Sequence, residues 1–486
     1  MELDAEIGVH EGKEKCYKEE EEICEVDKKL IINYGNVVIS IKEMLKQLPP
    51  LHGESSIYRV PKQLREMNRT AYAAQAISIG PFHHNSEDYL IAGQRYKLQC
   101  LVNFLHRLNK DEALEFLVKT AQSWVEEARK WYAEAIEMKE EEFAKMMLVD
   151  GCFIVEFMMG HQNGGWNFEE QKNATLSFYK GIIPTIYLDL IKLENQVPLF
   201  VLQRLFDLII PRSSTVDSIS IIVKLANWIH IFGFLGVYGR LPDDLPRQPK
   251  HLLDLLSMYF LHFRLKKHDQ KSTTFLSFFH SMCLLWQKKQ DVKNTGDLTL
   301  SPPSICELRE AGVTIKKAND AACINNISFK NGVLEIPHLF IDDSFEPIMR
   351  NLLAFEHFSQ KMEEMYVTHY VLFMDYLIST EKDVSLLVKA GIIINEIGGS
   401  DKEVSELFNN LCKFLVWIPP NLSHFRNISH DLRQYSDGWW NKAKASLKHN
   451  YFNTPWAIIS FFAATFLLLL TLLQTIFSAV STFRPT

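Results

Sequence analysis

The apolar positions of this chain recur mostly with helical spacing. Between residues 111 and 136 they fall three and four positions apart, which is the spacing of one helix face: Leu114, Leu117, Ala121, Trp124, Ala128, Trp131 and Ala135. Residues 141–159 and 183–210 are more uniformly apolar, which predicts central, buried helices. Two further helix starts carry the spacing of a capping box: Ser304 with Glu307, and Ser400 with Glu403. The pattern predicts a mainly α fold.

One region departs from helical spacing. Val313 and Ile315 alternate with polar residues, and the Asn331–Gly332 pair separates two short β-prone runs. Such a pair is a strong hairpin signal, because both residues tolerate the positive φ of a tight turn. We therefore expect a large helical body with a small antiparallel β-hairpin or meander inserted near residues 313–341.

The C-terminal end carries a segment that is long and apolar enough to span a membrane. Tyr451–Phe483 contains no Asp, Glu, Lys, Arg or His. Residues Ile458–Val480 alone would give about 34 Å of helix at about 1.5 Å per residue, so we expect a transmembrane helix over 455–480. A second apolar stretch, Ser218–Gly239, contains Lys224, Asn227 and His230, which favour a buried or membrane-touching helix over another span.

The residues that flank the predicted span indicate its orientation. Lys442, Lys444 and Lys448 precede it and only Arg484 follows. Positive charge favours the cytoplasmic side, so we expect a single-pass tail anchor with a cytosolic body, in the plasma membrane or an endomembrane. Five N-glycosylation sequons count weakly against this orientation: Asn68, Asn173, Asn326, Asn421 and Asn427.

Composition and charge narrow the class of protein. The 486 residues are 47% hydrophobic, which supports a substantial core, and the net charge of −7 argues against nucleic acid as a partner. Eight cysteines occur without a C-x-x-C pair, as expected of buried thiols in a reducing compartment. We expect residues 1–55 to be an acidic, partly disordered segment with one helix, and residues 56–447 to form the helical domain.

Several phrases resemble a known plant family. "IYRVPKQLREMNRTAYAAQAISIGPFHH", "LVDGCFIVEF", "LDLIKLENQVPLFVLQRL", "LEIPHLFIDDSFEPIMRNLLAFE" and "YFNTPWAIISFFAATFLLLLTLLQT" look like signature blocks of the domain of unknown function 247 family, in the family's order from about Ile57 to Gln474. The resemblance implies an uncharacterised plant protein with a C-terminal hydrophobic helix. Some grass members are implicated in self-incompatibility, which would imply recognition between proteins.

The stretch "SIGPFHHNSEDY" raises the possibility of a metal site or a catalytic pair. His83 and His84 lie beside two acids, after the turn at Gly80–Pro81. Adjacent side chains point in different directions, so at most one histidine easily serves a given centre. No second donor cluster with recognisable spacing occurs elsewhere, so we interpret the stretch as a structural loop and expect no metal and no cofactor.

Acids embedded in apolar sequence are the other candidate chemistry. Asp150, Asp189 and Glu356 are examples, and each needs a partner if it is buried. Arg59, Arg65 and Arg350 are natural partners. Two such acids with shifted pKa values could form an acid–base pair, although ion-paired acids that fix helix packing are commoner. The structural or functional candidates are Arg59, Pro61, Arg65, Gly80, Pro81, His83, His84, Asp150, Glu156, Glu194, Asn195, Asp342, Arg350, Glu356 and Asp375.

The sequence leaves two functional hypotheses. The first is a membrane-anchored, non-enzymatic protein that contacts the bilayer through its C-terminal helix and binds unidentified proteins in recognition or signalling. The alternative is a membrane-bound enzyme of hydrolase type that uses the buried carboxylates as an acid–base pair. The phosphate-binding, nucleophile-elbow, zinc-protease and dinucleotide-binding motifs are absent from the sequence, so no catalytic residue is assigned.

Overall fold

The structure is a computed structural model, and it divides the chain into two units, residues 1–53 and Glu54–Thr486. In the first unit the described residues, 36–45, form a helix. The described residues of the second unit are 55–84, 91–108, 112–162, 174–209, 222, 247–258, 301–319, 324–359, 361–415, 418–419, 421–438 and 455–482.

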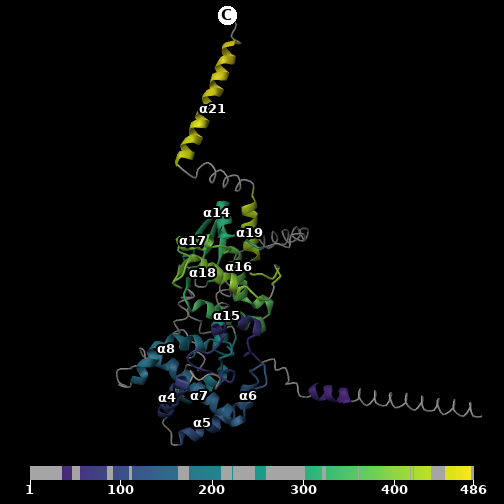
Figure 1. The fold of residues 1–486 in the computed structure, drawn as a ribbon, viewed down its shortest axis with the longest axis vertical. Coiled ribbons are helices and arrows are strands. Elements are labelled where there is room, and N and C mark those ends of the chain that lie inside the picture. Colours follow the sequence, from purple (N-terminus) through teal and green to yellow (C-terminus); the bar gives the residue numbers. More distant parts are fainter. Residues whose placement is uncertain are drawn as a thin grey trace, which may run out of the picture. The chain divides into compact units, whose positions relative to one another are not determined.

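Helices dominate the second unit, which confirms the predicted fold class (Figure 1). Those before the strands are α2 (Lys62–Met67), α3 (Arg69–Tyr72), α4 (Ile91–Leu108), α5 (Ala113–Gln122), α6 (Val125–Arg129), α7 (Glu140–Gln162), α8 (Ala174–Leu190) and α9 (Leu199–Ile209). The later ones are α14 (Ile305–Glu310), α15 (Phe345–Ser359), the 3₁₀ helix η2 (Met362–Glu364), α16 (Tyr366–Leu377), α17 (Glu381–Lys389), α18 (Asp401–Leu411), α19 (Arg426–Asp437) and α21 (Pro455–Thr482).

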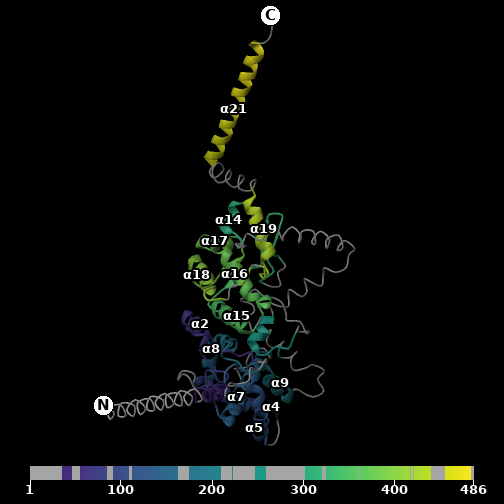
Figure 2. The ribbon, with the colours of Figure 1, turned by 90° about the vertical axis from the view of Figure 1, so that its right-hand side faces the viewer.

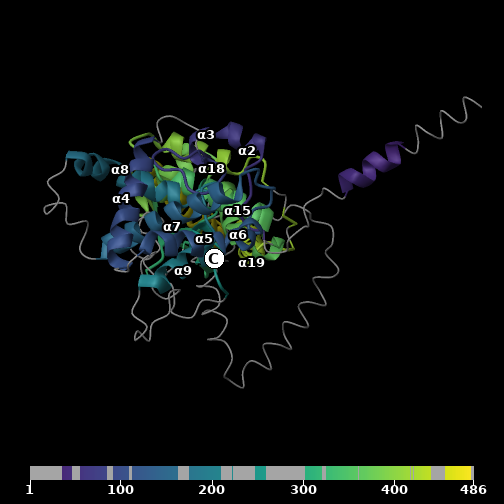
Figure 3. The ribbon, with the colours of Figure 1, turned by 90° about the horizontal axis from the view of Figure 1, so that it is seen from below.

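Helix α7 is the central helix of the first half of the body. Every residue from Asp150 to Met158 is buried, on all faces of the helix, as the uniformly apolar sequence predicts. Helices α4, α5 and α9 pack against it (Figure 3). Helix α9 packs closely against α7 at Gly151: a Cβ added there would lie 2.5 Å from Leu205 Cδ1, so the end of the Leu205 side chain would have to shift.

The second half of the body holds α14–α19 and the short strands, with α15 between the two halves (Figure 2). Helix α15 contacts α3 on one side and α16 and α18 on the other. Asn351 on α15 makes the connection specific. Its Oδ1 accepts a hydrogen bond from the Leu193 N–H at 2.9 Å, and its Nδ2 donates to the Ala71 carbonyl at 2.8 Å.

The predicted hairpin is confirmed, but the sheet around it is mixed. Strands β2 (Ser328–Lys330) and β3 (Val333–Ile336) pair antiparallel across Asn331–Gly332, which both have positive φ. Strand β1 (Thr314–Lys317) joins β3 in parallel, so the expectation of a purely antiparallel sheet is wrong. A further parallel pair links β4 (Leu339–Ile341) to β5 (Ile393–Asn395), because α15–α17 return the chain to the same edge.

The predicted single helix face between residues 111 and 136 is broken. Helix α5 ends at Gln122 and α6 at Arg129, and no helix follows until Glu140. Residues 131–133 instead bond to the backbone near Ile57: the N–H groups of Ser56 and Ile57 donate to the Trp131 carbonyl at 3.0 Å. This tertiary pairing overrides the helical spacing of the apolar residues.

Both predicted capping boxes are present, at Ser304–Glu307 and Ser400–Glu403. Residues 218–239, predicted as a buried or membrane-touching helix, lie outside the described residues except for Ile222. Helix α21 contains the predicted span from Ile458 to Val480. Its window Ile459–Ser478 has a mean hydropathy of 2.1 and is 0% buried within the protein, so it is long and apolar enough to cross a membrane.

Candidate functional site

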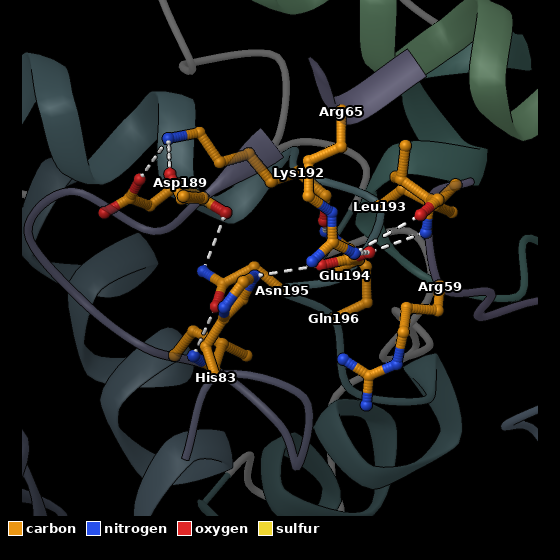
Figure 4. A network of polar contacts seen from close by, with 12 residues as sticks. Arg59, Arg65, His83, Asp189, Lys192, Leu193, Glu194, Asn195 and Gln196 are labelled. Atoms are coloured by element: carbon orange, nitrogen blue, oxygen red, sulfur yellow. Dashed lines mark hydrogen bonds and ion pairs between the residues drawn. The ribbon is translucent and has the colours of Figure 1, made fainter. Parts of the chain in front are cut away.

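The turn that follows α8 gathers buried polar side chains, and we call residues Asp189–Gln196 the polar turn. Asp189, Lys192, Glu194 and Asn195 are at most 2% exposed, and so is Gln196. Burial of so many polar groups costs free energy unless each is hydrogen-bonded. Figure 4 shows these side chains directed toward one another and toward the chain segment 55–84.

Asp189 binds the backbone of that segment. Its carboxylate accepts hydrogen bonds from the N–H groups of residues 75–77 at 2.6–3.0 Å. Lys192 Nζ donates to the same carboxylate at 2.8 Å and to the Ala73 carbonyl at 2.5 Å. Three amides and one cation therefore compensate the buried charge, and the carboxylate holds the chain in place.

The carboxamides of Asn195 and Gln196 form hydrogen bonds with backbone groups that belong to no β-strand. Asn195 Oδ1 accepts from the Ile79 N–H at 2.6 Å, and its Nδ2 donates to the carbonyls of Ile77 and Asp189 at 3.0 and 2.9 Å. Gln196 Nε2 donates to two carbonyls of the polar turn at 2.7 and 2.9 Å. Asn195 therefore satisfies buried backbone groups that a sheet partner would otherwise satisfy.

Glu194 joins three parts of the preceding segment. Its Oε1 accepts from the Val60 N–H at 2.6 Å and from the guanidinium of Arg65. Its Oε2 lies 3.5 Å from His83 Nε2. The Arg65 side chain is 35% exposed, so the pair is open to solvent on the arginine side only.

Burial, together with the nearby cations, keeps His83 neutral. Burial and the charges of Arg65, Lys192 and Arg59 together lower its pKa to about 4. Burial also raises the pKa of Glu194, against the Val60 hydrogen bond and Arg65. At neutral pH the contact is therefore between a carboxyl group and an uncharged imidazole, which is a weaker contact than an ion pair.

The Gly80 turn is held by the second buried acid. Asp150 on α7 accepts the Gly80 N–H at 2.8 Å and the Lys97 ammonium of α4 at 2.6 Å. The Lys97 and Asp150 side chains are 1% and 3% exposed. Gly80 has φ +71°, and a Cβ there would lie 2.4 Å from the Gln196 carbonyl oxygen. The turn requires glycine on both counts.

The two histidines of this loop do not share a centre. His83 faces Glu194, whereas the His84 backbone N–H donates to the Pro81 carbonyl at 3.4 Å. Burial lowers the pKa of His84, and the charge of Asp150 acts against that shift. Among the residues that the structure describes, no three His, Cys, Asp or Glu side chains are grouped so as to hold a metal ion. That no metal binds elsewhere stays a prediction.

The remaining candidates form an ion pair, stand at the start of a helix or contact a thiol. Glu156 accepts from Arg107 Nε at 2.8 Å, and its pKa is raised by burial against that ion pair. Asp342 Oδ1 accepts from the Ser344 N–H at 3.0 Å, just before α15. Pro61 stands at the N-cap of α2. Burial raises the pKa of Asp375, whose partner is the Cys412 thiol.

Two of the expected arginine pairings are wrong. Arg65 does bind a buried acid, whereas Arg59 binds Glu134 at 3.0 Å with both side chains about half exposed. Arg350 binds Glu346 of its own helix at 2.7 Å. Arg59 also lies over the Phe82 ring, 4.5 Å from its centroid, so its position serves packing as well as charge.

Sequence reasoning missed the cations that bind the other acids. Lys192 follows Asp189 by three residues, so helical spacing could have suggested that pair. Lys97 and Arg107 lie about fifty residues from their partners on another helix. No local signal identifies them, because their pairing depends on how α4 packs against α7.

Glu356 is a buried acid without a cation among its hydrogen-bond donors. Its carboxylate accepts from the Val367 and Thr368 N–H groups at 2.8 Å and from Thr368 Oγ1 at 2.7 Å. Burial raises its pKa to about 7, against these three donors. The folded state therefore holds the proton more tightly than the unfolded state, whose carboxyl titrates near 4.5.

We expect this group to lower the free energy of unfolding by about 3 kcal/mol as pH rises from about 4.5 to 7. The contribution is fully present below the unfolded pKa and lost as pH passes the folded one. In Glu356→Gln the pH-dependent part should vanish, so the stability of the variant relative to the wild type should rise by about 3 kcal/mol across this interval. Urea denaturation at several pH values measures it. A constant difference would contradict a raised pKa.

Comparison with known proteins identifies one matching plant family and two similar plant proteins. The model of a plant family described as "Plant protein of unknown function", domain of unknown function 247, matches residues 57–470. The UPF0481 protein At3g47200 of Arabidopsis thaliana is 30% identical over 433 residues, 87% of this chain and 86% of that protein. The putative UPF0481 protein At3g02645 of the same plant is 24% identical over 505 residues, 88% and 92% of the two chains. No solved structure matches.

Proposed function

Since the chain belongs to this plant family of unknown function, we propose that it is a single-pass membrane protein whose cytosolic body binds other proteins in recognition or signalling. The observation that carries the proposal is the 20-residue window Ile459–Ser478 of α21, which is apolar and 0% buried within the protein. A helix of this composition gains free energy in hydrocarbon, where its backbone hydrogen bonds are already satisfied internally.

The charges on either side of α21 support a cytosolic body. Lys442, Lys444 and Lys448 precede the helix, and Arg484 is the one basic residue after it. Lysine and arginine are retained on the cytoplasmic side during insertion. Trp456 lies in the first turn of α21 and is 75% exposed, which suits a position at the headgroup level.

Apolar side chains on α4 and α5 support a role in protein binding. Leu98 and Val102 lie one turn apart on α4 and are 52% and 44% exposed. Leu114, Phe116 and Val118 on α5 are 41–47% exposed. Several exposed large apolar residues on two contacting helices are more typical of an interaction surface than of a solvated one.

The environment of the buried acids supports binding over catalysis. Asp150, Asp189 and Glu194 each have a cation of their own and a backbone N–H group. A hydrolase-type pair needs two carboxyl groups that exchange a proton with substrate. Carboxylates sealed in this way serve better to hold the polar turn and the Gly80 turn than to reach a substrate.

Membrane insertion is tested by removing α21. Full-length protein should stay in the pellet after carbonate washing of membranes, and a chain that ends at Asn450 should be released, because the apolar window is then missing. Protease added to sealed vesicles should digest the body but leave a fragment that contains α21. Retention of the truncated chain, or protection of the body, would contradict the anchor or the orientation.

Partner binding is tested on the exposed apolar side chains of α4 and α5, which we call the α4–α5 surface. Proximity labelling in plant cells should recover proteins with the wild type that are lost with Leu98→Glu/Val118→Glu. The matched control is Val388→Glu on α17, which is similarly exposed at 37%. Equal recovery from all three proteins would remove this surface from the proposal, and hydrolysis of a substrate that depends on Asp150 or Glu194 would favour the enzyme.

A further inference from the structure

Helix α21 has two chemically different faces. At about 100° per residue, six small or polar residues of the window Ile459–Ser478 fall within an arc of about 100°: Ser460, Ala464, Thr471, Gln474, Thr475 and Ser478. Leu467 is the large apolar residue of this window in the same arc, and Trp456 lies in it one turn before the window begins. The opposite side carries Phe462, Leu469, Leu472, Leu473 and Ile476, with Thr465 as a polar residue among them. A helix that only anchors a protein in lipid has no need for this division.

Gln474 is the residue of this face whose hydrogen-bonding groups lipid satisfies least. It lies within the Ile459–Ser478 window, four residues or about 6 Å from the end of it. The hydroxyls of Thr471 and Thr475 donate to carbonyls one turn back, each at 2.8 Å. In contrast, the Gln474 carboxamide is exposed and makes no hydrogen bond to the described part of the chain. It has two N–H donors and a carbonyl acceptor to satisfy.

We propose that α21 associates in the membrane with α21 of a second copy, through the face that contains Gln474. The inference rests on the membrane insertion proposed above. A second copy inserted in the same direction presents its own Gln474 at the same depth. A carboxamide is self-complementary, because the N–H of each can donate to the carbonyl of the other.

The rest of the face allows the close approach that such a pair needs. Ala464 and Ser460 lie one turn apart, and Ser478 lies one turn beyond Gln474. Small side chains at these positions let two helix backbones come together, and hydrogen bonds between helices are retained where no water competes. A symmetric pair also uses the same surface on both copies, as two-fold dimers do.

The test uses the purified full-length chain in lipid vesicles, labelled with donor and acceptor dyes in separate batches. Energy transfer should rise with protein-to-lipid ratio, and Gln474→Leu should weaken the association constant by about three- to thirty-fold. Thr465→Leu is the matched control, because Thr465 is polar, bonds its hydroxyl to the Phe461 carbonyl at 2.8 Å and lies on the opposite face. It should leave the association unchanged.

Two further outcomes separate the possible failures. If all variants stay in the carbonate-washed pellet but Gln474→Leu transfers energy like the wild type, the dimer is overturned and the membrane anchor stands. If the wild type itself is extracted by carbonate, both are overturned. A third outcome would also overturn the dimer. Pure wild-type chains would show no energy transfer, and in plant membranes a different membrane protein would bind the wild type but not Gln474→Leu. The face would then bind that protein instead of a second copy.

Discussion

Replacing Lys97 by methionine should lower the free energy of unfolding by about 3–5 kcal/mol. The substitution leaves the Asp150 carboxylate, 3% exposed, without its cation. An uncompensated buried charge is among the costliest defects in a protein, and methionine adds little steric strain to the effect because it has a similar length. Chemical denaturation of the full chain in detergent, followed by tryptophan fluorescence, measures the loss.

Two further variants isolate the cause. Lys97→Met/Asp150→Asn should recover most of the loss, because asparagine removes the charge and keeps an acceptor for the Gly80 N–H. Lys62→Met breaks the exposed pair with Glu66 and should change stability by no more than about 0.5 kcal/mol. Similar losses in the single and double variants would mean that the packing of α4, and not the charge, is responsible.

The second large effect is expected at the Gly80 turn. Gly80→Ala should cost about 3–4 kcal/mol, because the new Cβ would lie 2.4 Å from the Gln196 carbonyl oxygen and the backbone has φ +71°. That carbonyl is fixed by the Tyr132 hydroxyl at 3.0 Å, so it cannot move without losing a buried hydrogen bond.

Gly312→Ala separates the cost of the backbone conformation from the cost of the steric clash. Gly312 has φ +87°, but a Cβ there has no atom within 4 Å. Its substitution should therefore cost only the backbone strain, about 1 kcal/mol. Thermal unfolding of the three proteins side by side measures both values. Equal shifts in Tm would show that the Gln196 contact adds nothing to the cost at Gly80.

Local sequence determined the elements whose causes are local. A capping box needs two residues three positions apart, and both predicted boxes are present at Ser304 and Ser400. The hairpin needs only Asn331–Gly332 between two β-prone runs. The same holds for α21, since length and hydropathy alone make it able to span a membrane. The burial of Asp150, Glu156, Asp189, Glu194 and Glu356 was also predictable, because apolar residues surround each of them in sequence.

Tertiary structure decided which groups these acids meet. Asp150 binds Lys97 and Glu156 binds Arg107 because α4 packs along α7, whereas Arg59 remains half exposed on Glu134. Tertiary structure also interrupts the helix predicted over residues 111–136, because the backbone near Trp131 forms hydrogen bonds with the backbone near Ile57 instead. Sequence spacing reports contacts within a few residues, and a pair such as Lys97–Asp150 exists only once two distant helices have been brought together.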